Sequence, residues 1–197
     1  MKYNGTDKYC YKEHHGVLIN NFNIKDDDLL DKKIISEQML IIDNISISYP
    51  YNLKTLCEIH REMFSCAFKW AGKIRDIDIS KGTTRFCSNP YIEKEGNLIF
   101  NRVNTLHKKF LSKPISDFTN DEKIEYIKEL GKITTDLNYL HPFREGNGRT
   151  LRLFIELFLH NLGINLSWPS SPDRWMKASI EDNENEFTSL ILENMSI

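Results

Sequence analysis

The chain has 197 residues, of which 40% are hydrophobic, and its formal net charge is −2. This length suits a single globular domain with its own core, and a charge so near zero gives no support for a nucleic-acid or membrane partner bound through bulk electrostatics. The N-terminal segment MKYNGTDKYCYKEHHG lacks the apolar core of a signal peptide, and the richest apolar run, Leu151–Leu159, is too short to span a bilayer. None of the four cysteines shows metal-ligand spacing, and Cys57 and Cys66 lie within apolar helical patterns, so we expect reduced, buried thiols in a cytoplasmic protein.

The first strong helical pattern runs from Leu53 to Phe64, with Pro50 near its start. His60 lies on the apolar face of this predicted helix. We interpret it as a core histidine whose hydrogen bonds are satisfied, in preference to a catalytic residue.

The segment 73–87, KIRDIDISKGTTRFC, breaks the helical pattern. Apolar residues alternate before a Lys-Gly turn and threonines follow it, which predicts a small β-hairpin. A solvated surface hairpin without a functional role is the competing interpretation. The residues that would form its arms and turn are Ile77, Ile79, Lys81, Gly82, Thr83 and Thr84.

Two longer helices are expected next. The segment 97–111 repeats the helical pattern, and Thr119 with Glu122 predicts a capping box at the start of a helix that reaches Leu140. A proline disfavours helical backbone at the residue before it, so we expect this helix to end at His141 in an extended conformation.

Residues 141–152, HPFREGNGRTLR, combine groups that suit a nucleotide site. Glycines let the backbone approach a ligand closely, and a helix that begins at them would present N–H groups and its positive dipole end to a phosphate. Arg149 and Arg152 share one face of such a helix and are suited to gripping further phosphate oxygens. Glu145 suits a magnesium ion, which takes one or two carboxylates plus substrate phosphates. His141 is the natural general base of the set.

Each of these residues alone has a structural explanation. A lone histidine usually has no catalytic role, the arginines suit a solvated face or a pair with Glu156, and Gly146 and Gly148 suit a turn. A turn does not require a histidine, a carboxylate and two arginines in register, so the combination favours a phosphate-binding catalytic loop. The apolar segment 151–162, with Gly163 as its terminator, predicts a buried helix that supports this loop.

The loop resembles the signature of the Fic family, HxFx[DE]GNGRxxR, at every specified position. The upstream segment IHREMFSCAFKWAGKIR is also similar to the family, and the resemblance covers nearly the whole chain. It implies an all-α fold, a Fic-type helical bundle with a small β-hairpin flap, as one domain over residues 1–197. The matching positions are His141, Phe143, Glu145, Gly146, Asn147, Gly148, Arg149 and Arg152.

The resemblance implies a protein adenylyltransferase that transfers AMP from ATP to a Tyr, Thr or Ser hydroxyl of a target protein. On this basis His141 accepts the proton of the hydroxyl, which attacks the α-phosphorus while pyrophosphate leaves. Magnesium on Glu145 bridges the α- and β-phosphates, and Phe143 anchors the loop in the core.

The resemblance also assigns the phosphate contacts. Gly146, Asn147 and Gly148 hold the phosphates through backbone N–H groups, and Asn147 also orients the α-phosphate. Arg149 stabilises charge near the β-phosphate, and Arg152 reaches the γ-phosphate.

In Fic proteins the segment that corresponds to 73–87 is a flap beside the active site. Its exposed strand edge would pair with the backbone of a target segment. Such main-chain pairing aligns a hydroxyl without dictating the whole target sequence.

The C-terminal sequence Ser189-Leu-Ile-Leu-Glu193-Asn194 resembles the Fic inhibitory motif [ST]xxxE[GN]. The resemblance implies an inhibitory helix over about 184–195, in which Glu193 pairs with Arg152 and occupies the γ-phosphate position. The competing interpretation is an amphipathic terminal helix with a solvated Glu193.

Two alternatives stay open. The scaffold also serves other transferases of phosphate-containing groups, and the chain could be a toxin controlled by a separate antitoxin chain. Related bacterial proteins make a DNA topoisomerase such as gyrase one candidate target class, and no motif sets the oligomeric state.

Overall fold

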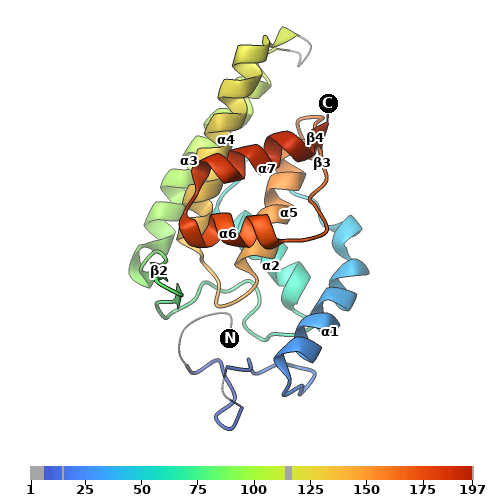
Figure 1. Cartoon of the computed structure of the whole chain (residues 1–197), viewed down its shortest axis with the longest axis vertical. Coiled ribbons are helices and arrows are strands. Elements are labelled where there is room, and N and C mark those ends of the chain that lie inside the picture. The colour runs from blue at the N-terminus through green and yellow to red at the C-terminus, as the bar shows by residue number, and fades with distance from the viewer. Residues whose placement is uncertain (1–6, 15, 114–116, 197) are drawn as a thin grey trace.

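The computed structural model describes residues 7–14, 16–113 and 117–196. Within this part, the chain is mostly helical and its strands form two small antiparallel pairs, which confirms the expected fold class (Figure 1). The helices are α1 (Asp27–Met39), α2 (Leu53–Phe64), α3 (Ile92–Phe110), α4 (Asn120–Leu140), α5 (Asn147–His160), α6 (Asp173–Glu181) and α7 (Glu184–Asn194), with short 3-10 helices η1 (Ile42–Asn44) and η2 (Asn89–Tyr91). The strands are β1 (Ser80–Lys81), β2 (Thr84–Arg85), β3 (Asn165–Leu166) and β4 (Met195–Ser196).

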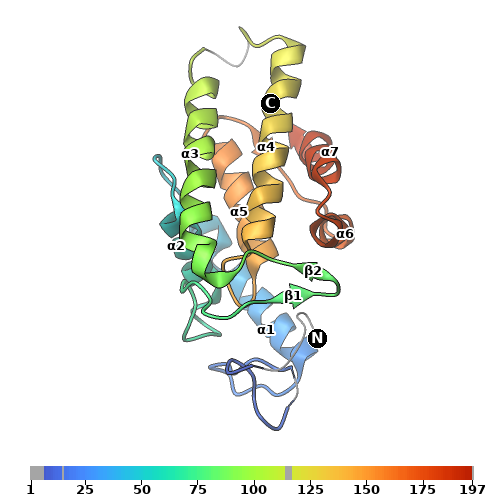
Figure 2. The same ribbon diagram turned by 90° about the vertical axis from the view of Figure 1, so that its left-hand side faces the viewer.

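The long helices α3 and α4 lie side by side and antiparallel, with α5 packed against α4 (Figure 2). Helices α6 and α7 pack on each other and on the outer side of α4, whereas α1 packs against α2. Helix α5 is apolar around most of its circumference and is largely buried, as its sequence predicts. It therefore forms a central support, and the loop 141–146 precedes its first turn.

Helix ends follow the local sequence. Thr119 and Glu122 form the predicted capping box of α4, and Gly163 adopts a positive φ of 76° just beyond α5. One detail of the prediction is wrong: His141 is left-handed (φ 41°, ψ 60°), not extended. The left-handed region also avoids the helical conformation that Pro142 disfavours.

Other expectations need correction. Helix α3 begins at Ile92 rather than Asn97, and α1 and α6 were not expected at all. Helix α1 buries a narrow stripe formed by Leu30, Ile34 and Gln38. Cys57 and Cys66 are free thiols as predicted, but they are only partly buried, and Cys66 follows the end of α2.

The hairpin exists but is shorter than predicted. β1 pairs with β2 across a turn at Gly82, where φ is 59°. Ile77 and Ile79 lie outside the two strands, so the predicted strand was too long, and their expected part in target docking stays a prediction. Ile79 is instead buried against Phe86, and these two residues with the partly buried Ile77 form a small separate core. The hairpin is fixed at its base by this core.

No helix among the described residues combines the length and apolar character needed to cross a bilayer.

Candidate active site

A cleft with a volume of about 250 Å³ lies at the N-terminal end of α5. Its walls come from α1, from the tip of the hairpin, from the loop that precedes α5 and from α6. The cleft thus brings together the base, the acid and both arginines predicted from sequence. Its lining residues are Asp31, Ile35, Lys81, His141, Glu145, Gly146, Asn147, Gly148, Arg149, Arg152, Pro172, Trp175, Met176 and Ser179.

His141 has a defined tautomer. Its Nδ1 lies 2.5 Å from the carbonyl oxygen of Asn138, and because a carbonyl only accepts, Nδ1 carries the proton and donates it. A neutral imidazole then has its lone pair on Nε2. The ring of Phe86 stacks on the imidazole at a centroid distance of 3.6 Å and fixes its plane. The side chain is therefore oriented as a base.

Burial keeps this base neutral. His141 is 5% exposed, and burial is the main reason that its pKa falls to about 3, with the cations of Arg75 and Lys81 adding to the effect. The hydrogen bond to Asn138 acts in the opposite direction. At neutral pH His141 is therefore uncharged, and its Nε2 is able to accept a proton.

Arg75 connects the loop to the base of the hairpin. Its buried guanidinium donates from Nε to the His141 carbonyl at 2.8 Å, from one terminal nitrogen to the Ile77 carbonyl at 2.6 Å, and from the other to the Cys87 carbonyl. Its backbone N–H donates to the Pro142 carbonyl at 2.9 Å. Arg75 thereby fixes the backbone of His141 relative to the segment that carries Phe86.

The turn into α5 depends on Gly146. Its φ is 82°, a backbone conformation that favours glycine. A Cβ there would also lie 2.3 Å from an atom of the Phe64 ring, so any side chain would clash. The Asn147 amide donates to the Phe143 carbonyl at 2.7 Å and accepts from the Phe143 N–H at 2.8 Å, which closes the loop. This side chain therefore braces the loop, and its expected role on the α-phosphate stays a prediction.

His60 is the satisfied core histidine that its sequence position suggested. Its Nδ1 accepts the Gly72 N–H at 2.8 Å, so its Nε2 carries the proton and donates to the Glu145 carbonyl at 2.9 Å. Burial lowers its pKa to about 3. A neutral His60 therefore positions the backbone of Glu145, the proposed metal ligand, through this hydrogen bond.

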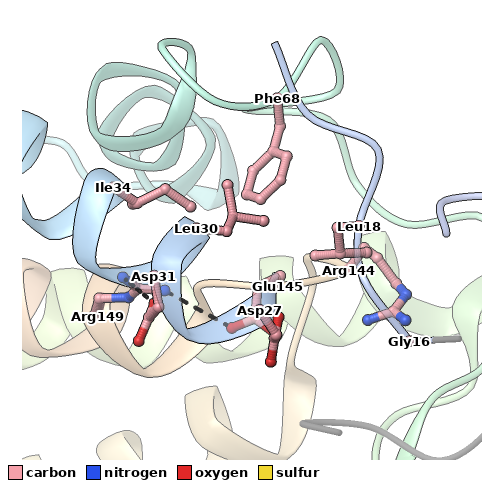
Figure 3. A pocket seen from close by; sticks show the side chains of 10 residues that line it. All are labelled: Gly16, Leu18, Asp27, Leu30, Asp31, Ile34, Phe68, Arg144, Glu145 and Arg149. Carbon is pink, nitrogen blue, oxygen red and sulfur yellow. Dashed lines mark ion pairs between the residues drawn. The ribbon is translucent and has the colours of Figure 1, made fainter. Parts of the chain in front are cut away.

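Glu145, Arg149 and Asp31 form a charged group beside the helix end (Figure 3). Arg149 lies 3.1 Å from Asp31 and 3.9 Å from Glu145, and its guanidinium stands 4.9 Å from the centre of the Phe64 ring. These contacts fix the direction of the Arg149 side chain. A phosphate that approaches the first N–H groups of α5, which have no carbonyl one turn back in the helix, meets this cation as well.

Arg152 is less tightly held. Among the described residues it forms no ion pair, and its Nε has no hydrogen-bond partner. The expected pair with Glu193 is absent. Glu193 pairs instead with Arg174 at the start of α6, at 2.5 Å, and 52% of its side chain remains exposed.

The residues fit a magnesium ion in one respect. Glu145 and Asp31 are the carboxylates that line the cleft near the start of α5, while no group of three or more potential ligands occurs among the described residues. Magnesium commonly takes one or two carboxylates and completes its shell with waters and substrate phosphates. A single Glu145 therefore suits an ion that arrives with the nucleotide.

The fold and the cleft together define a class: a helical domain in which a histidine, a glutamate and two arginines meet at the N-terminal end of a buried helix. The model of the Fic/DOC family matches residues 50–159, and the chain belongs to this family. The "Probable protein adenylyltransferase Fic" of Escherichia coli (strain K12) is 30% identical over 188 residues, which cover 94% of this chain and 89% of that protein. "Protein adenylyltransferase VbhT" of Bartonella schoenbuchensis is 30% identical and covers 99% of this chain, which spans 40% of that longer protein.

Solved structures have the same fold. The BepC protein of Bartonella tribocorum, with bound AMPPNP, superposes with a TM-score of 0.80 at 23% identity, over 95% of this chain and 96% of that chain. The N-terminal Fic domain of a cell filamentation protein from Bartonella quintana, with bound ADP, gives 0.79 at 23% identity, over 95% and 94%. At this level of identity the likeness concerns the fold.

Three residues of the site were not predicted from sequence patterns. Arg75 lies in a segment whose alternation pointed to the hairpin, so its role as a buried anchor left no local signal. Asp31 lies on α1 and Trp175 on α6, two helices that were not expected. An isolated tryptophan in a polar segment was the one available signal for a buried face on α6.

Proposed function

We propose that the chain is a protein adenylyltransferase that transfers AMP from ATP to a hydroxyl side chain of a target protein. The observation that carries the proposal is the tautomer of His141. A buried, neutral imidazole with its lone pair on Nε2 lies in the same cleft as a helix N-terminus and two arginines. The names of the relatives from E. coli and B. schoenbuchensis agree with this assignment.

In the proposed reaction His141 removes the proton from the target hydroxyl. The hydroxyl oxygen forms a bond to the α-phosphorus, the bond from that phosphorus to the bridging oxygen breaks, and pyrophosphate leaves with the electron pair. The N–H groups at the start of α5, Arg149 and Arg152 bind and orient the phosphates. Magnesium held by Glu145 would neutralise phosphate charge.

Transfer of another phosphate-containing group is the alternative. It is separated by mass spectrometry of proteins incubated with the chain, ATP and magnesium. We expect modified target proteins to gain AMP. A gain of phosphate, or no modification with a folded chain and a broad protein extract, would contradict the proposal.

For the target we propose that the hairpin edge pairs with an extended segment that carries the hydroxyl. Lys81 at the hairpin tip lines the cleft, and Thr84 donates to the Ile180 carbonyl at 2.6 Å, which holds the hairpin against α6. Lys81, Gly82, Thr83 and Thr84 remain the docking residues of this proposal, while Ile77 and Ile79 support them. A DNA topoisomerase such as gyrase is the target class suggested by the family resemblance.

Self-inhibition by the C-terminal helix stays a prediction, and its structural basis has changed. The helix is present as α7, but Glu193 bonds to Arg174, so an inhibitory action through Arg152 would require this pair to break. Control by a separate inhibitory chain is the alternative. A carboxylate from such a partner could pair with Arg152 while the pair between Glu193 and Arg174 stays intact.

A further inference from the structure

Trp175 lies in the cleft with a buried indole N–H that has no hydrogen-bond partner. The residue is 5% exposed, and Nε1 is shielded from solvent. Its ring is fixed by edge contacts with Trp168 at 5.1 Å and with Phe187 at 4.8 Å between centroids. A buried donor without a partner is destabilising, so its position needs an explanation.

The indole nitrogen faces the proposed phosphate-binding end of α5. It lies 3.4 Å from the position that a Cβ of Gly148 would occupy, so the missing side chain keeps this approach clear. Gly148 and Arg152 are four residues apart and share a helix face. Arg152 also has an unpartnered nitrogen, so two side chains with unpaired donors line one cleft.

The order of residues along α6 gives the position of Trp175 relative to the base. The Ser179 hydroxyl donates to the Asn138 side chain at 2.6 Å, and the Asn138 carbonyl accepts the His141 proton, so Ser179 marks the base end of the cleft. Trp175 precedes Ser179 by one helical turn, about 6 Å along the axis. The α-phosphorus must lie near His141, so Trp175 lies away from the reacting centre, in the part of the cleft where Arg152 supplies a cation suited to an outer phosphate.

Resting on the proposed function, we propose that the Trp175 indole N–H, together with Arg152, hydrogen-bonds the terminal phosphate of a nucleoside triphosphate. Arg152 forms no ion pair among the described residues, so its side chain can turn toward the phosphate without breaking a contact of that kind. The pair then distinguishes a triphosphate from a nucleoside monophosphate.

Not every unpaired indole has this meaning. Trp70 also has a buried N–H without a partner, but it packs among the rings of Phe68, His60 and Tyr9 and does not line the cleft. The contrast makes Trp70→Phe a matched control for Trp175→Phe. Each change removes one buried indole N–H and keeps an aromatic ring.

The test follows the indole N–H resonances of ¹⁵N-labelled protein, assigned with the Trp→Phe variants. The probes are AMPPNP with magnesium and AMP with magnesium, and binding is measured in parallel by calorimetry. We expect AMPPNP to shift the Trp175 resonance and AMP to leave it near its free position. We also expect Trp175→Phe to weaken AMPPNP binding about tenfold and AMP binding less than about twofold, with both nearly unchanged in Trp70→Phe.

The outcomes separate the two proposals. If the wild-type chain binds AMPPNP but the Trp175 resonance does not move at saturation, the role of Trp175 is wrong and the proposed function stands. Equal weakening of AMPPNP and AMP binding in Trp175→Phe would also overturn it, because a general packing defect acts on both ligands. If the folded wild-type chain binds neither probe at millimolar concentration, the proposed function itself is contradicted.

Discussion

The catalytic loop and the C-terminal end of α7 carry the two sequence motifs of the chain, yet they are held by different kinds of contact. The loop is fixed by buried hydrogen bonds from Arg75, His60 and Asn147. Glu193 is held by an ion pair with Arg174, and both side chains are about half exposed.

The difference matters because the two kinds of contact have different energies. A buried polar group left without its partner costs about 1–3 kcal/mol, whereas exposed ion pairs contribute about 0–1 kcal/mol. The loop geometry is therefore set before a ligand binds, and the end of α7 is only weakly fixed.

The largest effect is expected for His141→Ala. A positioned general base contributes roughly 10²–10⁴-fold to rate, while the helix end and the arginines that bind phosphate remain. Transfer measured with labelled ATP should fall by that factor, and the dissociation constant for AMPPNP should change little. Transfer at the wild-type rate would remove His141 from the mechanism.

Arg75→Met should reduce kcat by about a hundredfold, since displacement of a catalytic group by about 1 Å has that order of effect. It should also shift the pH profile. The Arg75 cation helps to lower the pKa of His141, so its removal raises that pKa, and the acid limb of kcat moves to higher pH. The AMPPNP dissociation constant serves as the control. A rate loss without a shift of the acid limb would indicate general damage.

His60→Phe tests the support behind the loop. The change keeps a ring but leaves the Gly72 N–H and the Glu145 carbonyl unpaired, so we expect a loss of stability on the order of 3 kcal/mol at pH 7. The folded-state pKa of His60 is about 3, below its unfolded value of 6.5, so its neutral form stabilises the fold above pH 6.5, and this contribution is lost as the pH falls toward 3. Denaturant unfolding at pH 7 and pH 4 measures both the loss of stability caused by the substitution and the dependence of stability on pH. The variant should show a smaller loss between the two pH values than the wild type.

The smallest effect is expected for Glu193→Gly. Because the partner of Glu193 is Arg174, the rate of transfer should change by less than about twofold, as for other exposed ion pairs. Glu186→Gly is the matched control, since Glu186 pairs with the same arginine at 2.7 Å but lies outside the motif. Activation of tenfold or more in Glu193→Gly alone would contradict this expectation and support the predicted self-inhibition by α7.

Sequence patterns predicted the parts of the site that are local. The residues of 141–152 are contiguous, and the helices on both sides have clear apolar periodicity and a capping box, so the loop and its support could be inferred. The walls of the cleft could not be inferred from the sequence. Asp31 and Trp175 reach it from helices with few buried residues, and the contacts of Arg75 with His141 and Cys87 depend on tertiary packing. The predicted pair between Glu193 and Arg152 was wrong for the same reason, because a motif specifies a residue and not its partner.

The central claim is that His141, the proposed general base, is neutral and preorganised before any ligand binds. The direct measurement is the ¹⁵N NMR spectrum of the His141 imidazole in the free protein, assigned with His141→Ala and followed from pH 8 to pH 4. We predict one neutral tautomer throughout this range, with the proton on Nδ1 and none on Nε2, because the pKa lies near 3. An imidazolium at pH 7, or a proton on Nε2 in the neutral ring, would contradict the account.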